Sequence, residues 1–462
     1  MQTECTLKLF EFEAVGRRAV VAQFDGGTIT SNAGALLLGQ LDAGLGLIRR
    51  FAQCFIDRRD QRYVEHGVAT LLGQRVFGLV LGYEDLNDHD ELRKDPIFAV
   101  LAGKLEPGFR TNCEPVAGKS TLNRLEHTPK RNGGKYHKID CNDDAARALL
   151  VDLFVETHKR PPQQIVLDLD ATDIPLHGHQ EGRFFHGYYD TYCYLPLYVF
   201  CGRELLLAKL RRSNIDASAG AVEEIARIVT RIRERWPHVR IILRADSGFA
   251  REELMHWCET NSVDFVFGLA RNNRLEEAIA EHLSRAQRQC AQTGRSARLF
   301  RDFRYSTLDS WSCERRVIGK AEHTAQGANP RFVVTSLRRA AYDARALYED
   351  LYCARGEAEN RIGEQFELWA DRASSATMAA NQLRLTFSAI AYVLINALRR
   401  IALCKTQFAD AAVETIRLKL LKLGARVCTS VRRIHFAIAS SCPNQQEFEA
   451  AYLALKRTFS SA

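Results

Sequence analysis

The chain has 462 residues, of which 46% are hydrophobic and 26% charged, and its formal net charge is +8. This ordinary globular composition excludes wholesale disorder, a collagen-like repeat and a small disulfide-stapled scaffold. The length allows about three domains at roughly 150 residues each. The surplus of Lys and Arg suits a polyanionic partner without identifying one.

Thirteen cysteines are scattered singly along the chain, and no C-x-x-C pair occurs. This pattern predicts buried, reduced thiols in a cytoplasmic protein rather than disulfides or a zinc cluster. Charged residues interrupt the N-terminal segment, so no signal peptide is expected. The apolar stretch from Leu385 to Leu398 has 14 residues, which suits a buried helix rather than a membrane span.

Residues 1–150 predict a mainly helical N-terminal domain after one or two short strands. Helices are expected from about residue 33 to 51 and from Tyr63 to about Leu81, where apolar residues recur with helical spacing. Residues 104–145 are polar and rich in Gly and Pro, which predicts a loop-rich connection around a short helix near Leu122. The second helix is preceded by arginines that are either a solvated helix start or phosphate contacts: Arg58, Arg59 and Arg62.

Residues 160–275 alternate between strands and helices, which is typical of an α/β core. Residues 276–340 return to strand-like sequence and predict a β-rich insertion, after which residues 341–400 supply the last core helices, the first from about Asp343 to Leu368. Residues 401–462 predict a small basic α+β tail with nine Lys or Arg against four Asp or Glu. Its stretch 425–439 reads as one edge strand with basic residues on both faces, near DNA or protected against aggregation.

Two strands of the expected core end in aspartates. In the sequence IVLDLD at 165–170, alternation places Asp168 and Asp170 on the same face of a strand. The strand at 239–246 ends in Asp246 and turns into a helix. Carboxyl ends of parallel strands are where α/β sheets place their sites, although each Asp alone also suits a helix cap or a turn.

A third group of polar residues lies on the helix that follows the insertion. Tyr352, Arg355 and Glu359 are three and four residues apart, which places them on one helical face. The alternative is an ordinary surface ion pair between Arg355 and Glu359. Carboxylates converging from two strand ends and a helix would suit two divalent cations about 3.5 to 4 Å apart, the arrangement used for in-line attack on a phosphodiester. Oxygen ligands favour Mg²⁺, with Mn²⁺ as a substitute.

These motifs together resemble bacterial insertion-sequence transposases of the DDE superfamily. The resemblance is carried by FDGGTITSNAG, LDLDATD, RADSGF, the Tyr352-x2-Arg355-x3-Glu359 signature and NQLRLTFSAIAYVLI, so it spans nearly the whole chain. It implies a ribonuclease-H-like core interrupted by the β-rich insertion. It also implies that Asp170, Asp246 and Glu359 are catalytic residues and metal ligands, with Asp170 preferred to Asp168 because it begins the D-x-T pattern.

The resemblance further implies contacts with double-stranded DNA. Tyr352 and Arg355 match residues that hold transposon-end phosphates, and the N-terminal region is expected to serve DNA binding or assembly. A signature Lys seven residues after the Glu is replaced by Phe366, so Arg361 or Arg372 is expected to supply that contact. Trp311 is similar to an aromatic that related transposases stack on a flipped base, with a packed strand Trp as the alternative.

Two other motifs have simpler interpretations. The sequence AGKS at 117–120 lacks the earlier Gly of a phosphate-binding loop, and no nucleotide cofactor is expected. His177, His179 and His186 lie in a Gly-rich segment without zinc-type spacing, which predicts a loop.

The resemblance therefore implies a bacterial, nucleoid-associated DNA transposase in the cytoplasm, without membrane contact. It would bind terminal inverted repeats, cut DNA with two Mg²⁺ ions and transfer the strand, acting as a homodimer on DNA. The alternatives are a two-metal nuclease without strand transfer and a DNA-binding relative that no longer cuts.

Overall fold

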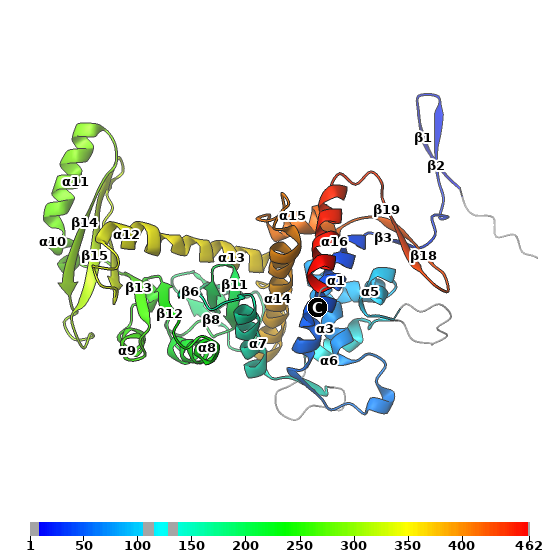
Figure 1. Cartoon of the computed structure of the whole chain (residues 1–462), viewed down its shortest axis with the longest axis horizontal. Coiled ribbons are helices and arrows are strands. Elements are labelled where there is room, and N and C mark those ends of the chain that lie inside the picture. Colours follow the sequence, from blue (N-terminus) through cyan, green and yellow to red (C-terminus); the bar gives the residue numbers. More distant parts are fainter. Residues whose placement is uncertain (1–8, 105–114, 128–136, 461–462) are drawn as a thin grey trace, which may run out of the picture. The chain divides into compact units, whose positions relative to one another are not determined.

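The computed structural model describes residues 9–104, 115–127 and 137–460, so parts of the expected loop at 104–145 lie outside it. The chain divides into two compact units, one of residues 1–140 and 390–462 and the other of residues 141–389 (Figure 1). From the sequence we expected an N-terminal domain, a core in two parts around a β-rich insertion, and a basic tail. The structure instead joins the N-terminal region to the basic tail, and the insertion to the core.

The core unit is built on a nine-stranded mixed sheet, in the order β11-β10-β6-β12-β13-β17-β15-β14, with β16 paired to β15. The first five strands match those expected between residues 160 and 275. They are β6 (Gln164–Ala171), β10 (Leu197–Cys201), β11 (Glu204–Lys209), β12 (Arg240–Ala245) and β13 (Asp264–Leu269). Strand β10 is antiparallel to β6 and β11, whereas β6, β12 and β13 run parallel. This is the ribonuclease-H-like arrangement, and the predicted fold class is confirmed.

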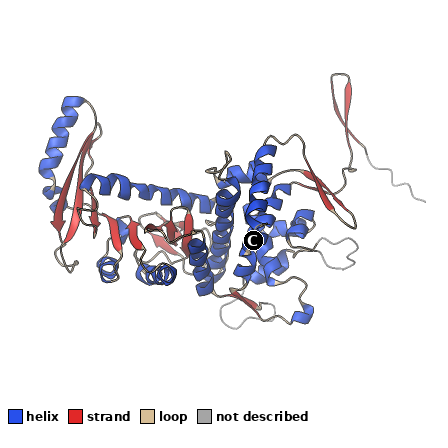
Figure 2. Cartoon of the chain, in the orientation of Figure 1, coloured by secondary structure: helices blue, strands red, loops and turns tan. Residues whose placement is uncertain are grey.

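Helices cover both faces of this sheet (Figures 1 and 2). On one face, Ile165, Leu167 and Leu169 of β6 belong to a core cluster with residues of α8 (Ala221–Arg235) and α9 (Glu252–Thr260). On the other face, the segment over residues 344–366 crosses the sheet, where Leu347 and Leu351 pack on Ile242 of β12. The strand alternation therefore directs Asp168 and Asp170 toward this second helical segment. Two further helices complete the unit: α7 (Asp143–Glu156) and the first part of α14 (Met378–Leu398).

The insertion does not form a separate β block. It begins with two helices that were not predicted, α10 (Asn273–Ala278) and α11 (Ala280–Thr293). Its strands then extend the core sheet beyond β13, because β17 pairs with β13 and β15 pairs with β17. They are β14 (Ala297–Tyr305), β15 (Arg315–Thr324), β16 (Gly327–Ala328) and β17 (Arg331–Thr335). The α11 helix was missed because its sequence is polar overall and only Ala286 of it is fully buried.

The other unit is mainly helical, as expected for the N-terminal region. The strand β3 (Ile29–Thr30) pairs with β18 of the tail, which explains why both ends of the chain share one unit. Its helices are α1 (Leu36–Leu45), α2 (Leu47–Ala52), α3 (Val68–Val80), α4 (His89–Leu92), α5 (Pro96–Leu101), α6 (Lys119–Glu126), α15 (Val413–Ile416) and α16 (Gln445–Phe459). Its strands are β1 (Phe10–Val15), β2 (Arg18–Ala22), β4 (Phe55–Asp57), β18 (Ala425–Thr429) and β19 (Ile434–Ile438), with β5 (Ile139–Cys141) at its boundary.

The expected single strand at 425–439 is instead a hairpin. Strands β18 and β19 pair antiparallel, and Ser430 donates its backbone N–H to the carbonyl of Arg433 at 2.8 Å. Arg432 and Arg433 therefore lie in an exposed turn rather than on opposite faces of a strand. The prediction was wrong because the alternating pattern of side chains in the sequence continues through the short polar turn, so the pattern does not show where one strand ends and the next begins.

The expected late apolar helix is longer than its 14-residue apolar stretch. Residues Met378–Leu403 form 26 helical residues that are long and apolar enough to cross a membrane, but 83% of the most apolar window is buried in protein. A buried core helix can also be this long and apolar, so the length and composition of this helix do not indicate a membrane span. The described cysteines are unpaired, yet four of them are exposed rather than buried as expected: Cys313, Cys353, Cys404 and Cys428.

Candidate active site

Two parallel strands bring Asp170 and Asp246 to the same edge of the core sheet. In the pairing of β6 with β12, Asp168 lies opposite Arg244 and Leu169 opposite Ala245. Asp170 and Asp246 are the next residues along the two strands. Because neighbouring strands are about 4.8 Å apart, these two carboxylates are close together.

The environment of Asp170 disfavours its charged form. The side chain is buried, and burial, together with the nearby charges of Asp246 and Glu359, raises its pKa to about 7, although Arg355 opposes the shift. An aspartate that titrates near neutral pH beside other carboxylates is a candidate functional group, because gathered like charges are costly without a cation between them.

Asp246 is held by a short turn at the end of β12. Its Oδ1 accepts a hydrogen bond from the backbone N–H of Gly248 at 2.8 Å, which caps the following 3₁₀ turn, Ser247–Phe249. The neighbouring strand makes room for this turn at Gly268. A Cβ there would lie 2.5 Å from Tyr352 Oη and 2.9 Å from the backbone N of Ser247. Gly268 thus permits the close approach of Tyr352 to the Asp246 turn, a role that the sequence alone did not reveal.

The helical segment that carries the third carboxylate is irregular. It begins as α12 (Ala344–Ala346), widens into a π-helical turn over Leu347–Tyr352, tightens into a 3₁₀ turn over Cys353–Arg355 and continues as α13 (Gly356–Phe366). The expectation of one regular helix from Asp343 to Leu368 is therefore wrong in detail. The segment still directs the signature residues to the strand ends.

Arg355 links the helix to the sheet at the candidate site. Its Nη1 lies 3.4 Å from Asp170 Oδ2, and its Nη2 lies 2.8 Å from Glu359 Oε1. Burial alone would lower the pKa of Arg355, but the charges of Asp170, Tyr352, Glu359 and Asp246 raise it above its ordinary value. Tyr352 is also part of this group, since burial raises its pKa, with Arg355 opposing the shift and Asp246 adding to it. Asp170 and Glu359 therefore both contact the Arg355 guanidinium, and Asp246 acts on it through its charge.

The donor set fits a hard divalent cation. Three carboxylates and one guanidinium leave an excess of negative charge, and carboxylate oxygens are the ligands that Mg²⁺ prefers. Among the residues described, no three Asp, Glu, His or Cys side chains converge closely enough to hold a metal ion as they stand. Glu359 instead points its carboxylate at Arg355, which lies between it and Asp170.

Asp168 has a different role from Asp170, although both side chains are buried on the same face of β6. Arg244 donates to both of its carboxylate oxygens, at 2.5 and 2.8 Å, and to the carbonyl of Leu351 at 2.5 Å. Asp168 and Arg244 therefore fasten β6 and β12 to the π-helical turn. The sequence preference for Asp170 over Asp168 agrees with this geometry.

The other predicted DNA contacts lie apart from this group. Trp311 is in the loop between β14 and β15, where its ring packs 5.7 Å from Tyr305 and lies under Arg315 at 5.5 Å. Arg361 is mostly buried on α13 and pairs with Glu364 at 3.5 Å. In the described part of the chain, no hydrogen bond or ion pair joins either residue to the three carboxylates. Phe366 ends α13, whereas Arg372 is exposed and rests over the Trp369 ring at 5.6 Å.

The AGKS sequence and the histidine-containing segment have ordinary structural roles. Lys119, in the AGKS sequence, donates its backbone N–H to Asp90 Oδ1 at 2.9 Å, so an acidic side chain already faces the start of α6. His177 and His179 lie in the loop between β7 (Ile174–Pro175) and β8 (Phe184–His186), as expected for a Gly-rich segment. His186 instead ends strand β8, so the loop prediction is wrong for this residue.

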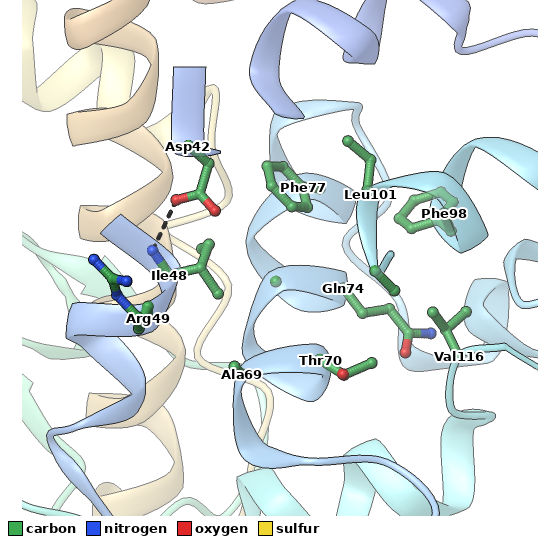
Figure 3. Close-up of a pocket in the computed structure, with 12 residues that line it drawn as sticks. Asp42, Ile48, Arg49, Ala69, Thr70, Gln74, Phe77, Phe98, Leu101 and Val116 are labelled. Carbon is green, nitrogen blue, oxygen red and sulfur yellow. Dashed lines mark hydrogen bonds between the residues drawn. The ribbon is translucent and has the colours of Figure 1, made fainter. Parts of the chain in front are cut away.

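A separate cavity of about 200 Å³ lies in the mainly helical unit (Figure 3). Its walls are polar and apolar in about equal parts, with Phe77, Phe98 and Val116 facing Asp42 and Arg49. Asp42 accepts a hydrogen bond from the backbone N–H of Ile48 at 2.8 Å, as the dashed line in Figure 3 marks. None of the predicted site residues lines this cavity.

The ribonuclease-H-like sheet, with two strand-end aspartates and a helix-borne glutamate beside them, defines the chain as a member of the DDE class of nucleic-acid-processing proteins. A family model, described as transposase DDE domain group 1, matches residues 12–460, and the chain belongs to this family. The resemblance inferred from the motifs is confirmed.

Two further comparisons add little. No curated protein matches the chain. Among solved structures, a chain of the piggyBac transposase synaptic complex with hairpin DNA, determined by cryo-EM, is similar at a TM-score of 0.39 and 12% identity, over 84% of this chain and 80% of that chain. A likeness of this size carries no conclusion about function.

Proposed function

We propose that the protein is the transposase of a bacterial insertion sequence, which binds the terminal inverted repeats of its element, cuts them and joins them to target DNA. The observation that carries this proposal is that Arg355 contacts both Asp170 and Glu359, next to the strand end that carries Asp246, in a chain of the transposase DDE domain family. The protein would act in the cytoplasm, on the nucleoid, and as a homodimer because two ends must be cut.

The three carboxylates would hold two Mg²⁺ ions, or Mn²⁺ in their place. These ions would activate the attacking water or 3′-hydroxyl and stabilise the leaving oxygen. Asp170 and Asp246 are fixed by the sheet, so they set the position of the reacting phosphate. Glu359, whose side chain is 59% exposed, completes the set when Arg355 releases it.

Arg355 and Tyr352 would then hold DNA phosphates beside the reacting bond. A guanidinium released from two carboxylates is suited to bind a phosphate through two hydrogen bonds. Arg372 is the better candidate for the contact made elsewhere by the signature Lys, because Arg361 is mostly buried and already paired. The exposed turn of the β18–β19 hairpin, with Arg432 and Arg433, offers further backbone contacts.

The experiment is a cleavage and joining assay with end-labelled DNA from the borders of the element, Mg²⁺ or Mn²⁺, and a target plasmid. The wild type should cut the ends and join them to the plasmid. Asp246→Ala should abolish both products while DNA binding remains. Glu357→Gln is the matched control, since this exposed carboxylate lies on the same helix outside the group.

Each outcome separates the proposal from its alternatives. Cutting without joined products would indicate a two-metal nuclease. Binding without cutting at any metal concentration would indicate a DNA-binding relative. If Asp246→Ala cut as well as the wild type, the assignment of the three carboxylates would be wrong.

A further inference from the structure

A small aromatic hairpin lies next to the candidate site, and none of the functions considered so far uses it. We call residues 184–192 the aromatic hairpin; it comprises β8 and the start of β9 (Thr191–Tyr194), in a three-stranded sheet of order β7-β9-β8. Four of its rings are exposed: Phe184 at 37%, Phe185 at 53%, Tyr188 at 85% and Tyr192 at 45%. So many exposed aromatic side chains on one short segment indicate an interaction surface.

The base of the aromatic hairpin is firmly anchored, so its exposed rings are not a poorly packed core. Cys193 and Tyr194 are fully buried, and Tyr194 donates its hydroxyl to the carbonyl of Glu181 at 2.5 Å. Ser213 donates its hydroxyl to the carbonyl of Phe184 at 2.9 Å. Strand β9 therefore turns its later side chains inward and presents Tyr192 outward on a rigid support.

The aromatic rings connect strand β6, which carries Asp170, with the surface. Tyr189 Oη lies 3.5 Å from the carbonyl oxygen of Ala171, the residue after Asp170. Burial and the charges of Asp173, Asp170 and Asp246 raise the pKa of Tyr189 to about 12, in keeping with this position. The Tyr188 ring contacts that of Tyr189 edge-on at 5.0 Å, so the most exposed ring is one contact away from the carboxylate edge.

Positive charge accompanies these rings. The guanidinium of Arg183 lies over the Tyr192 ring at 4.5 Å. Arg212 is exposed beside the same hairpin, with its side chain 3.3 Å from the position of a Cβ on Gly182. Aromatic faces interleaved with guanidinium groups bind single-stranded nucleic acid, in which bases stack on rings while cations follow the phosphates.

We propose that the aromatic hairpin stacks unpaired DNA bases next to the bond that the three carboxylates cut. This inference rests on the proposed function, which places a DNA backbone at Asp170. The occupant must be unpaired, because the faces of bases inside a duplex are covered by their neighbours. The aromatic hairpin would thus favour DNA that is opened at the site of cleavage.

The test compares two probes of the same sequence, with EDTA present to prevent cutting. One is a fully paired labelled duplex, and the other carries a central unpaired bubble with 2-aminopurine in it. The full-length wild type should bind the bubble about tenfold more tightly than the duplex, since each stacked base contributes roughly that factor. The 2-aminopurine emission should change on binding.

Matched variants separate stacking from loss of structure. Tyr188→Ala with Tyr192→Ala should remove the preference for the bubble and the emission change while leaving duplex affinity unchanged. Tyr188→Phe with Tyr192→Phe should keep both, because the rings remain. Tyr452→Ala, on α16 with 44% exposure, is the control and should behave as the wild type. Thermal unfolding monitored by circular dichroism shows that each variant is folded.

The outcomes distinguish this inference from the proposed function. If the double Ala variant keeps the bubble preference, the aromatic hairpin does not stack bases and only this inference fails. If that variant instead changes the sedimentation of the protein and not its DNA binding, the rings form an interface between copies, which also overturns it. A wild type that prefers the bubble yet cuts no DNA with Mg²⁺ would overturn only the proposed function.

Discussion

Asp168 and Asp170 lie two residues apart on the same face of one strand, and both are buried, but their surroundings differ in kind. Asp168 is paired with the guanidinium of Arg244, which also donates to the carbonyl of Leu351 and is not shared with the other carboxylates of the site. Asp170 faces two other carboxylates and shares Arg355 with Glu359. The Asp168–Arg244 pair, which we call the first layer, is balanced in charge. The group of Asp170, Asp246, Glu359 and Arg355, which we call the second layer, carries an excess of negative charge.

This difference shows how two carboxylates at the same depth in a protein can be distinguished by the charges around them. A buried ion pair with complete hydrogen bonding fixes strands and helices in position and has little capacity to bind anything else. A group of carboxylates that lacks enough cations is unfavourable in isolation, and it becomes favourable when a cation binds. The four predictions below test this contrast.

The largest effect is expected from the loss of a charge in the second layer. Asp170→Asn should lower DNA cleavage by at least about 10³-fold, because a metal ligand supplies several kcal/mol of transition-state stabilisation. Its unfolding free energy without metal should stay equal or rise. Single-turnover cleavage and urea unfolding measure the two effects. Activity within tenfold of wild type would show that Asp170 holds no metal.

For the Asp168–Arg244 pair, the expected effect is a loss of stability. Asp168→Ala should lower the unfolding free energy by about 3 to 5 kcal/mol, because it leaves Arg244 buried without its partner. Urea unfolding measures the change. Asp168→Leu combined with Arg244→Met should recover much of it, since neither charge then remains buried. A fully stable Asp168→Ala variant would show that the pair does not fasten the sheet to the π-helical turn.

The metal-free protein should lose stability as pH rises. The folded-state pKa of Asp170, about 7, is above its ordinary value of 3.8, so its contribution is complete below about pH 4 and is lost as pH rises through 7. The loss should be on the order of 2 to 4 kcal/mol by pH 8. Urea unfolding in EDTA at pH 5 and pH 8 measures it, and Asp170→Asn should flatten the difference.

The smallest effect is expected at Arg355, whose guanidinium is shared by Asp170 and Glu359. Arg355 lowers the pKa of Asp170, so Arg355→Ala should raise that pKa further and extend the pH-dependent loss of stability of the metal-free protein to higher pH. The same unfolding series between pH 5 and 9 would detect the change. Arg372→Ala is the control, because its guanidinium rests on a tryptophan ring rather than on the carboxylates. An unchanged midpoint in Arg355→Ala would mean that Arg355 does not compensate Asp170.

The core and its strand-end aspartates could be predicted from sequence because they depend on local patterns. The alternation in β6 fixed the face of Asp170, and the apolar run of β12 fixed the position of Asp246. Arg244 stands two residues before Asp246, but its partner Asp168 depends on the register between two strands. That register is set by packing over the whole sheet and has no local signal.

Other features depend on long-range contacts and could not be predicted. The pairing of β3 with β18 joins residues from opposite ends of the chain. The close approach at Gly268 is set by Tyr352, which arrives from another element. The aromatic hairpin overlaps the segment with His177, His179 and His186, which was expected to be a loop. Its exposed rings and its contact with Ala171 depend on the folded structure and have no local signal.

The π-helical turn over Leu347–Tyr352 has a consequence for how the site could have arisen and how it can be altered. Such a turn holds one more residue than an α-helical turn, and its hydrogen bonds skip one position further. At its start, Leu347 and Tyr348 are packed in the core, and beyond its end Glu359 contacts Arg355. The wide turn absorbs the mismatch between these two anchor points. Deleting one residue within it should leave both flanking helices intact but rotate one against the other by about 100°. The alignment of Glu359 with its aspartates therefore depends on a single surplus residue in the chain.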